Sequence, residues 1–260
     1  MNRLEEVEIG EDLAGAWFEC NLLLTSFMEA ISFVTPELEQ FMVRAVAAEL
    51  PGQSDSELRQ RCLDFIREEA MHSKMHGKLN TSLLNHLGRV PPGLAAIGAA
   101  MTYARKHFAS SRCLGLSAAT EHLTAAVSGA YLLRENEIHI QSPFVKTLFN
   151  RHAHEEISHR AVVFDLWRVR WTTARMQRAL SLLSVVVSLL FYLALAVPWV
   201  LYRKTGNSKL KTLGAICRCV DAGRLGEWVI RLPTMCFPFI RSDYHPDHSI
   251  STRVGLSTDT

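Results

Sequence analysis

A Glu-Glu-x-x-His motif occurs twice in this chain and limits its fold more than any other feature. The two copies span Glu68–His72 and Glu155–His159. In a helix, the second Glu and the His of each copy project from one face because they are three residues apart, so each pair can bind one metal ion. The repeat therefore predicts two helices that each carry half of a dinuclear metal site.

A dinuclear site needs further carboxylates, which helix bundles supply from two additional helices. One glutamate precedes each motif at a similar distance, Glu39 before the first copy and Glu121 before the second. The chain thus predicts an all-α, ferritin-like four-helix metal-binding bundle made of two similar helix pairs. The predicted metal ligands are Glu39, Glu69, His72, Glu121, Glu156 and His159.

Capping and stop signals place these residues on separate helices. Thr35-Pro36 is typical of a helix start, because proline is favoured in the first turn, and Pro51-Gly52 is typical of a stop. Ser54-Asp55-Ser56-Glu57 has the pattern of a capping box. The predicted helices are 35–50 with Glu39 in its first turn, 54–87 with the first motif, 94–107 as a connection, 110–133 with Glu121, and 142–171 with the second motif.

Two more histidines extend the motifs, because His76 lies one turn after His72 and His152 lies one turn before Glu156. The second and fourth ligand helices of a ferritin-like bundle run antiparallel, so we expect His76 and His152 to face each other beside the metals. They can form a third metal position, or they can hydrogen-bond to the ligands and line an access channel.

Other ionisable residues beside the motifs are expected to support the site from outside. Glu68, His154 and Glu155 neighbour the ligands in sequence but point away from them on a helix. We expect these three residues to contact the ligands from the outer side or to face solvent. His122 adjoins Glu121, and we expect it to have a structural role rather than to bind metal.

The stretch 179–202 contains no charged residue and is flanked by arginine and lysine on both sides. It is long enough to span a bilayer. Three serines at helical spacing and one proline are also compatible with an apolar helix or hairpin that packs on the bundle or rests on a membrane. The expected organisation is a metal-binding bundle at 1–172, followed by an apolar segment and C-terminal extension at 173–260.

Charge and cysteine content limit the partners and the compartment. The net charge of +2, with no basic stretch rich in aromatic residues, gives no reason to expect nucleic acid binding. The six cysteines are scattered, and the acidic N-terminus lacks the apolar core of a signal peptide, so we expect a cytoplasmic protein. Contact of 179–202 with an inner membrane is the alternative. The expected partners are a small-molecule or lipid substrate, and a homodimer is also compatible with the sequence.

Five segments of this chain follow the pattern of a known family. They are 36–41 around Glu39, FIREEAMHSKMHGKLN at 65–80, ATEHLTA at 119–125, HAHEEISHRAVVFD at 152–165, and Tyr-His-Pro at 244–246. With them, most of the chain resembles a bacterial ferritin-like family described as predicted metal-dependent hydrolases. The resemblance implies a metal-binding helical bundle. The family usually has glycine directly before the first ligand, where this chain has Leu38, so we expect this helix start to differ in shape.

The ligand set also bears on the chemistry. Four carboxylates and two imidazoles leave open positions on two metals and suit Fe or Mn better than a structural Zn. We expect two ions per chain, Fe first with Mn or Zn as alternatives, and a third ion if His76 and His152 bind one. The favoured function is O₂-dependent oxidation of an unidentified substrate at a di-iron centre, and the apolar segment suggests a hydrophobic substrate. One alternative is a metal-dependent hydrolase that uses a metal-bound hydroxide. Another is a non-enzymatic metal store, which would not need the apolar segment.

Overall fold

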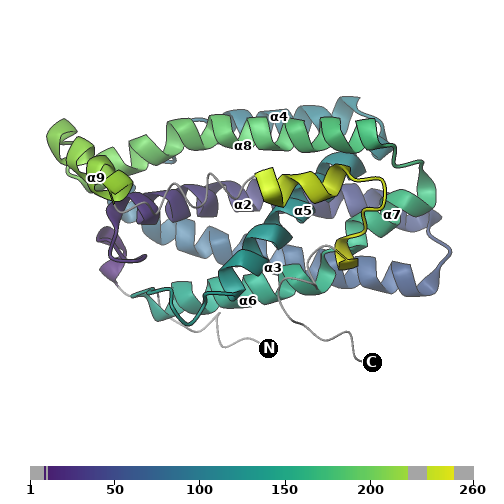
Figure 1. The fold of residues 1–260 in the computed structure, drawn as a ribbon, viewed down its shortest axis with the longest axis horizontal. Helices are drawn as coiled ribbons and strands as arrows, with labels where there is room; N and C mark the ends of the chain where they lie inside the picture. The colour runs from purple at the N-terminus through teal and green to yellow at the C-terminus, as the bar shows by residue number, and fades with distance from the viewer. Residues whose placement is uncertain (1–8, 10, 222–232, 249–260) are drawn as a thin grey trace.

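The secondary structure is helical in the part of the chain that the computed structural model describes, namely residues 9, 11–221 and 233–248. Within these residues, the strand-like pairing is limited to an isolated antiparallel bridge between Phe18 and Ile140. The predicted all-α fold is therefore confirmed. The elements are η1 (Glu11–Ala14), α2 (Leu22–Glu49), η2 (Leu50–Gly52), α3 (Ser56–Leu87), α4 (Leu94–His107), α5 (Ser110–Leu132), α6 (Pro143–His159), α7 (Val162–Arg170), α8 (Arg175–Lys204), α9 (Lys209–Asp221) and η3 (Phe237–Ile240) (Figure 1).

Helices α2, α3, α5 and α6 form the bundle that carries the candidate ligands (Figure 1). Helix α2 packs against α3 and α5, and α6 packs against the same two helices, so the four enclose a common interior. Phe33, Phe65, Met75 and Phe144 are among the side chains buried there. Burying one such side chain is worth about 1.5–3 kcal/mol, so this interior supplies a large part of the force that holds the helices together.

Helix α2 begins earlier than the sequence predicts. Its N-cap is Asn21, whose side-chain oxygen accepts hydrogen bonds from the backbone N–H groups of Leu23 and Leu24 at 2.9 and 3.1 Å. Pro36 consequently lies inside the helix, and Glu39 lies well past its first turn. The predicted start at Thr35-Pro36 is wrong because the preceding apolar residues bury themselves against the bundle as helix, which outweighs the local preference of proline for a first turn.

Pro36 leaves the carbonyl of Ser32 without its helical hydrogen bond, because proline has no backbone N–H. The side-chain amide of Asn80 on α3 donates to this carbonyl oxygen at 2.9 Å. In return, the Ser32 hydroxyl donates to Asn80 Oδ1 at 2.7 Å. The gap that proline opens in α2 is therefore closed from α3, and the two helices are joined beside the candidate site.

The second and third predicted helices occur at nearly the predicted bounds. Asp55 caps α3 by accepting hydrogen bonds from the N–H groups of Glu57 and Leu58 at 2.9 and 3.1 Å. The cap is thus one residue later than the first serine of the capping-box pattern. Gly88 ends α3 with a left-handed φ of 78°, a conformation that glycine adopts at little cost.

The helix that carries the second motif is shorter than predicted. Helix α6 ends at His159, and a two-residue turn separates it from α7. At this turn, the Arg160 guanidinium donates to the carbonyl of Ile157, which the end of the helix leaves free. The turn allows α7 to bury Phe164 and Trp167 against its neighbours. Neither glycine nor proline marks this position, so the sequence predicted one continuous helix.

The apolar segment forms one helix, α8, which lies against α2 and α5 on the outside of the bundle (Figure 1). Among the described residues it is the one helix that is long and apolar enough to cross a membrane. Only 22% of its most apolar window is buried, so it is not an ordinary core helix. Its inner side is fixed to the bundle, where the Tyr192 hydroxyl donates to the Ala30 carbonyl at 3.0 Å.

Lys204 fixes the C-terminal end of α8 inside the protein. Its side chain is 2% exposed, and Nζ donates to Glu29 Oε1 at 2.6 Å and to the carbonyl of Leu13 at 2.8 Å. Trp17 Nε1 donates to the same carboxylate oxygen at 2.8 Å. Lys204 is thus part of a buried ion pair, although in the sequence it is one of the basic residues that flank an apolar stretch.

Candidate metal centre

The predicted ligands and the two additional histidines converge in the interior of the four-helix bundle. Seven of them are buried, and His152 is partly buried. The interior therefore concentrates carboxylate and imidazole groups that would otherwise be solvated. Helix α2 supplies Glu39, α3 supplies Glu69, His72 and His76, α5 supplies Glu121, and α6 supplies His152, Glu156 and His159.

Helices α3 and α6 run antiparallel through the site. The contacts pair Glu69 with His159 at one level and His76 with His152 one to two turns away. His76 Nε2 lies 3.2 Å from His152 Nδ1. The prediction that these two histidines face each other is therefore confirmed.

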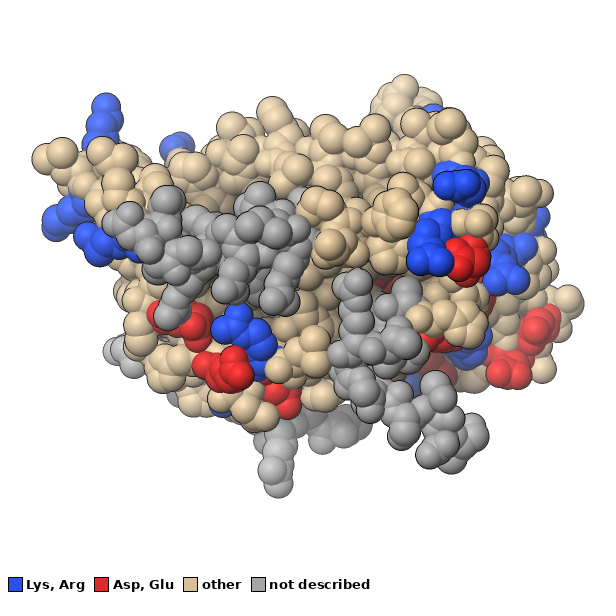
Figure 2. Space-filling view, viewed as in Figure 1, with Lys and Arg blue, Asp and Glu red and all other residues tan. Residues whose placement is uncertain are grey.

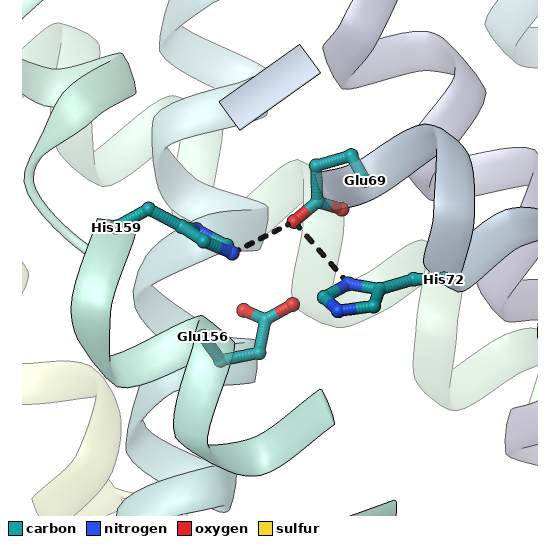
Figure 3. A group of neighbouring side chains, drawn as sticks. All are labelled: Glu69, His72, Glu156 and His159. Carbon is teal, nitrogen blue, oxygen red and sulfur yellow. Dashed lines mark ion pairs between the residues drawn. The ribbon is translucent and has the colours of Figure 1, made fainter. Parts of the chain in front are cut away.

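Glu69, His72, Glu156 and His159 form the first group of candidate ligands (Figure 3). One donor atom from each lies within 4.8 Å of the others. Glu69 Oε1 is 3.2 Å from His159 Nε2 and 3.7 Å from His72 Nδ1. Two ligands on opposite sides of one ion, with bonds of about 2.1 Å, are roughly 4.2 Å apart. Small side-chain movements would therefore bring all four residues onto one ion.

Glu39, His76 and His152 form a second group, again with donor atoms within 4.8 Å of one another. Glu39 Oε1 lies 3.8 Å from His152 Nδ1 and 3.9 Å from His72 Nδ1. Glu39 is thus the member of the second group that also approaches the first group. The described residues could hold two ions, one in each group, with the identity of the metal left open by the donor atoms.

Glu155 fixes the orientation of the His72 ring from the outer side. His72 Nε2 and Glu155 Oε2 are 2.6 Å apart, and Arg151 Nε donates to the other oxygen of Glu155 at 2.8 Å. Because an ionised carboxylate only accepts, Nε2 donates in this contact and Nδ1 faces the interior. This is the arrangement in which a carboxylate orients a metal-binding histidine. The expectation that Glu155 contacts a ligand from outside is therefore confirmed.

Glu121 has a similar contact with His159. Its Oε1 accepts a hydrogen bond from His159 Nδ1 at 2.7 Å, which leaves His159 Nε2 directed toward Glu69. The second oxygen, Oε2, is buried without a hydrogen bond. Glu121 is not among the donors of either group above. Its contacts orient His159, and its assignment as a direct ligand stays a prediction that its free oxygen permits.

Buried atoms that lack hydrogen bonds test whether this set fits a metal. Across the described residues, eight of the thirteen such side-chain atoms belong to the centre. A buried polar atom without a partner costs about 1–3 kcal/mol, and a charged one costs more, so a cluster of them calls for a cation. These atoms belong to Glu39, Glu69, His72, Glu121, Glu156 and His159, the six residues predicted as ligands from the sequence.

Burial and mutual repulsion alter the protonation of these groups. Burial, and then the charges of neighbouring carboxylates, raise the pKa of Glu39 well above its usual range. The same causes raise the pKa of Glu121 to about 8. Burial lowers the pKa of His159, but the charge and hydrogen bond of Glu121 outweigh it, and the pKa rises to about 10. A bound cation must displace these protons, so its binding strengthens as pH rises.

Ser32, Asn80 and Thr124 support the centre and were not identified from the sequence. Thr124 donates to Glu156 Oε2 at 2.5 Å and lies one turn after Glu121, which is a spacing that could have revealed it. Ser32 was missed because α2 was predicted to start after it. Asn80 had no local signal, since its role depends on a carbonyl of another helix.

A chain of hydrogen bonds fixes the tautomer of His76. The Ser32 hydroxyl gives its proton to Asn80, so Ser32 Oγ accepts from His76 Nδ1, 3.0 Å away. The lone pair of His76 is therefore on Nε2, facing His152. Burial, and then the neighbouring His152, lower the pKa of His76 well below its usual range, so this imidazole is neutral.

We expect Asn80→Leu to lower the free energy of unfolding by about 1–3 kcal/mol, because the Ser32 carbonyl then loses its donor. The matched control uses Pro36→Ala, which restores a helical N–H for that carbonyl. In the Pro36→Ala background, the same Asn80→Leu change should cost less, and urea unfolding of the four proteins measures the difference. Equal costs in both backgrounds would contradict the assigned link between Pro36 and Asn80.

His122 lies outside the two metal groups. Its Nδ1 is 2.8 Å from the Tyr244 hydroxyl, and its Nε2 is 2.7 Å from the carbonyl of Met235. Burial lowers the pKa of His122 to about 4. The neutral ring thus joins α5 to the segment around η3, which confirms its predicted structural role.

A cavity of about 190 Å³ adjoins the second group. Glu39, His76, His152 and Glu156 line its inner end. The remaining wall is mainly apolar, so a substrate with an apolar portion could be held beside the carboxylates and imidazoles. The apolar lining includes Met28, Ile31, Leu38, Leu123, Phe149 and Leu189.

Comparison with protein families matches residues 2–249 to a family described as predicted metal-dependent hydrolases. No curated protein and no solved structure matched the chain. The match covers nearly the whole sequence, including both Glu-Glu-x-x-His motifs and the helices that carry the other candidate ligands. A relationship to ferritin-like proteins stays a prediction. The chain belongs to the family of predicted metal-dependent hydrolases.

Proposed function

We propose that this protein is a metal-dependent hydrolase with a dinuclear centre, acting on a substrate that has an apolar portion. The observation that carries the proposal is the set of buried ligand atoms without hydrogen bonds, which lies beside an apolar cavity. Family membership supports hydrolysis in particular. Two bound divalent ions would act as Lewis acids and promote attack by water on the substrate.

The side chains that line the cavity have distinct roles in this proposal. Glu39 and Glu156 would hold metal beside the cavity, and the apolar wall would position the substrate and exclude bulk water. His152 lies between Glu156 Oε1 at 3.0 Å and His76 Nε2 at 3.2 Å. If the second ion is held without these histidines, His152 can accept a proton from the reacting groups, and the lone pair at His76 Nε2 can share it.

The test is hydrolysis by protein that has been stripped with a chelator and reloaded with Zn, Mn or Fe(II) under anaerobic conditions. We expect metal-dependent turnover of p-nitrophenyl esters, with octanoate preferred over acetate because only the longer chain reaches the apolar wall. Turnover should fall at least tenfold in His152→Ala and be unchanged in His86→Ala, which lies outside the cavity. If no metal raises hydrolysis of carboxylic or phosphoric esters above the stripped protein, hydrolysis is the wrong reaction.

A second candidate function is O₂-dependent oxidation at a di-iron centre. The observation that favours it is the mixture of carboxylate and imidazole donors in the two groups, which suits Fe or Mn. In this case the anaerobic Fe(II) protein consumes O₂ and gains near-ultraviolet ferric absorption. The same reloaded samples distinguish the two reactions, since a hydrolase works with Zn and without O₂.

A further inference from the structure

Helix α8 presents an apolar face to solvent over most of its length. Leu183, Leu190 and Phe191 are 59%, 50% and 63% exposed, although α8 packs on the bundle. Soluble proteins rarely expose apolar side chains that follow one another along a whole helix, and such a face usually contacts a partner. The neighbouring helix α4 extends this surface, because Leu94 and Met101 of α4 share a hydrophobic cluster with Tyr192 of α8.

The inner side of α8 is held to the protein at three levels. Arg178 near its start donates to the carbonyl of Arg241 at 2.6 Å, Tyr192 bonds to Ala30 in the middle, and Lys204 pairs with Glu29 at the end. A helix that crossed a bilayer would have to leave these contacts or carry the bundle with it. The geometry therefore favours a helix that lies flat, with one face on the bundle and the other available to a partner.

The charged residues of the two helices that form this surface have one sign. Neither α4 nor α8 contains an acidic residue. Basic residues lie at the C-terminal end of α4, at both ends of α8 and on α9, which follows α8. Figure 2 shows the upper edge of the molecule free of acidic groups along α8, with basic groups toward its two ends. The exposed basic residues are Arg105, Lys106, Arg175, Lys209, Lys211 and Arg218.

We infer that the α4–α8 face, formed by the outer sides of these two helices, docks on the surface of an anionic phospholipid bilayer. The apolar side chains of α8 enter the boundary between headgroups and acyl chains, and the flanking basic residues contact lipid phosphates. An apolar face with a basic border and without carboxylates matches such a surface better than it matches a second copy of itself, whose basic residues would repel.

Docking in this way also bears on the proposed function, although it does not depend on it. Leu189 of α8 lines the apolar cavity that reaches Glu39, His152 and Glu156. The wall of the cavity thus includes the same helix that touches the lipid. A substrate with an acyl chain could pass from the membrane to the metal centre along this wall.

Sedimentation with vesicles tests the inference on the whole 260-residue chain, loaded with metal. We expect it to sediment with vesicles that contain phosphatidylglycerol, more weakly with pure phosphatidylcholine, and less as salt screens the charges. The triple variant Leu183→Gln, Leu190→Gln, Phe191→Gln should bind anionic vesicles at least tenfold more weakly, so that it stays in the supernatant. The control Leu63→Gln, Leu133→Gln replaces exposed apolar residues of α3 and of the loop after α5 and should bind as wild type.

Further measurements separate loss of membrane binding from loss of the fold or of the metal centre. Metal content of the triple variant should be unchanged, so that loss of binding is separate from failure of the metal centre. If the triple variant loses helicity by circular dichroism, the double variant Lys209→Gln, Lys211→Gln must weaken binding to anionic vesicles instead.

Alkaline carbonate should release the bound protein from the vesicles. Protein that stays with the vesicles would show a spanning helix and overturn docking. Absence of vesicle binding, with a dimer in light scattering that the triple variant breaks, would assign the face to a second copy.

Discussion

Glu69→Gln is expected to leave the protein with at most one of its two metal ions. Glu69 Oε1 lies between His159 Nε2 and His72 Nδ1, at 3.2 and 3.7 Å, so this carboxylate joins the motif of α3 to the motif of α6. Glutamine keeps the size of the side chain but removes the negative charge that a divalent cation requires. Elemental analysis after anaerobic reloading measures the loss as ions per chain.

Glu68→Gln is the matched control, because it makes the same chemical change one residue earlier, about 100° around α3 from Glu69. It should retain two ions. Full metal content in Glu69→Gln would show that the ligand assignment is wrong.

The same measurement on His76→Ala decides the role of the second group. Loss of an ion would make His76 a ligand, and unchanged metal with reduced turnover would make it a residue that positions protons.

Lys204→Met is expected to lower the free energy of unfolding by about 3–5 kcal/mol, because it leaves the carboxylate of Glu29 buried without its cationic partner. Glu29 is fully buried, and of its two hydrogen-bond donors among the described residues, Lys204 and Trp17, only Trp17 would remain. Methionine preserves most of the volume of lysine, so the change tests charge rather than packing. Urea unfolding followed by circular dichroism measures it.

The loss should depend on pH in a defined direction. Burial raises the pKa of Glu29 above 4.5, although Lys204 lowers it, so removing Lys204 raises this pKa further. When folding raises the pKa of a carboxyl group, the folded state binds its proton more tightly than the unfolded state does. Such a group destabilises the folded state most at high pH, where the carboxyl group ionises in the unfolded state without this cost. The deficit of Lys204→Met should therefore shrink as pH falls toward 4.5. The double variant Glu29→Gln, Lys204→Met should recover stability, and a deficit equal to that of the single variant would contradict the ion-pair explanation.

Much of the centre could be predicted from the sequence because helix geometry is local. The spacing of Glu69 and His72, repeated in Glu156 and His159, determines which side chains share a face, whatever the fold does around them. The antiparallel pairing of His76 with His152 followed from the same geometry once four helices were assumed. All of these positions lie within single, regular helices.

The features that the sequence did not reveal depend on contacts between elements. The start of α2 was misplaced because Pro36 resembles a first-turn proline, and only Asn80 of another helix shows how its missing hydrogen bond is replaced. The turn after His159 has no glycine or proline to mark it. Lys204 is charged, and its burial depends on Glu29, which is far away in sequence. In each case the deciding partner belongs to a distant segment.

The hydrogen bonds between Asn80 and Ser32 fix the sliding position of α2 relative to α3. A shift of α2 by one residue along its axis is about 1.5 Å and would present a carbonyl that already has its own helical N–H to the Asn80 amide. Pro36 thus determines which carbonyl of α2 can accept this bond, because it leaves that carbonyl without a helical N–H. Glu39 lies three residues after Pro36, so the same bond fixes the position along the bundle axis at which its carboxylate approaches His72 and His152. The missing N–H of Pro36 in α2 thereby helps to fix where Glu39 lies relative to the ligands of α3.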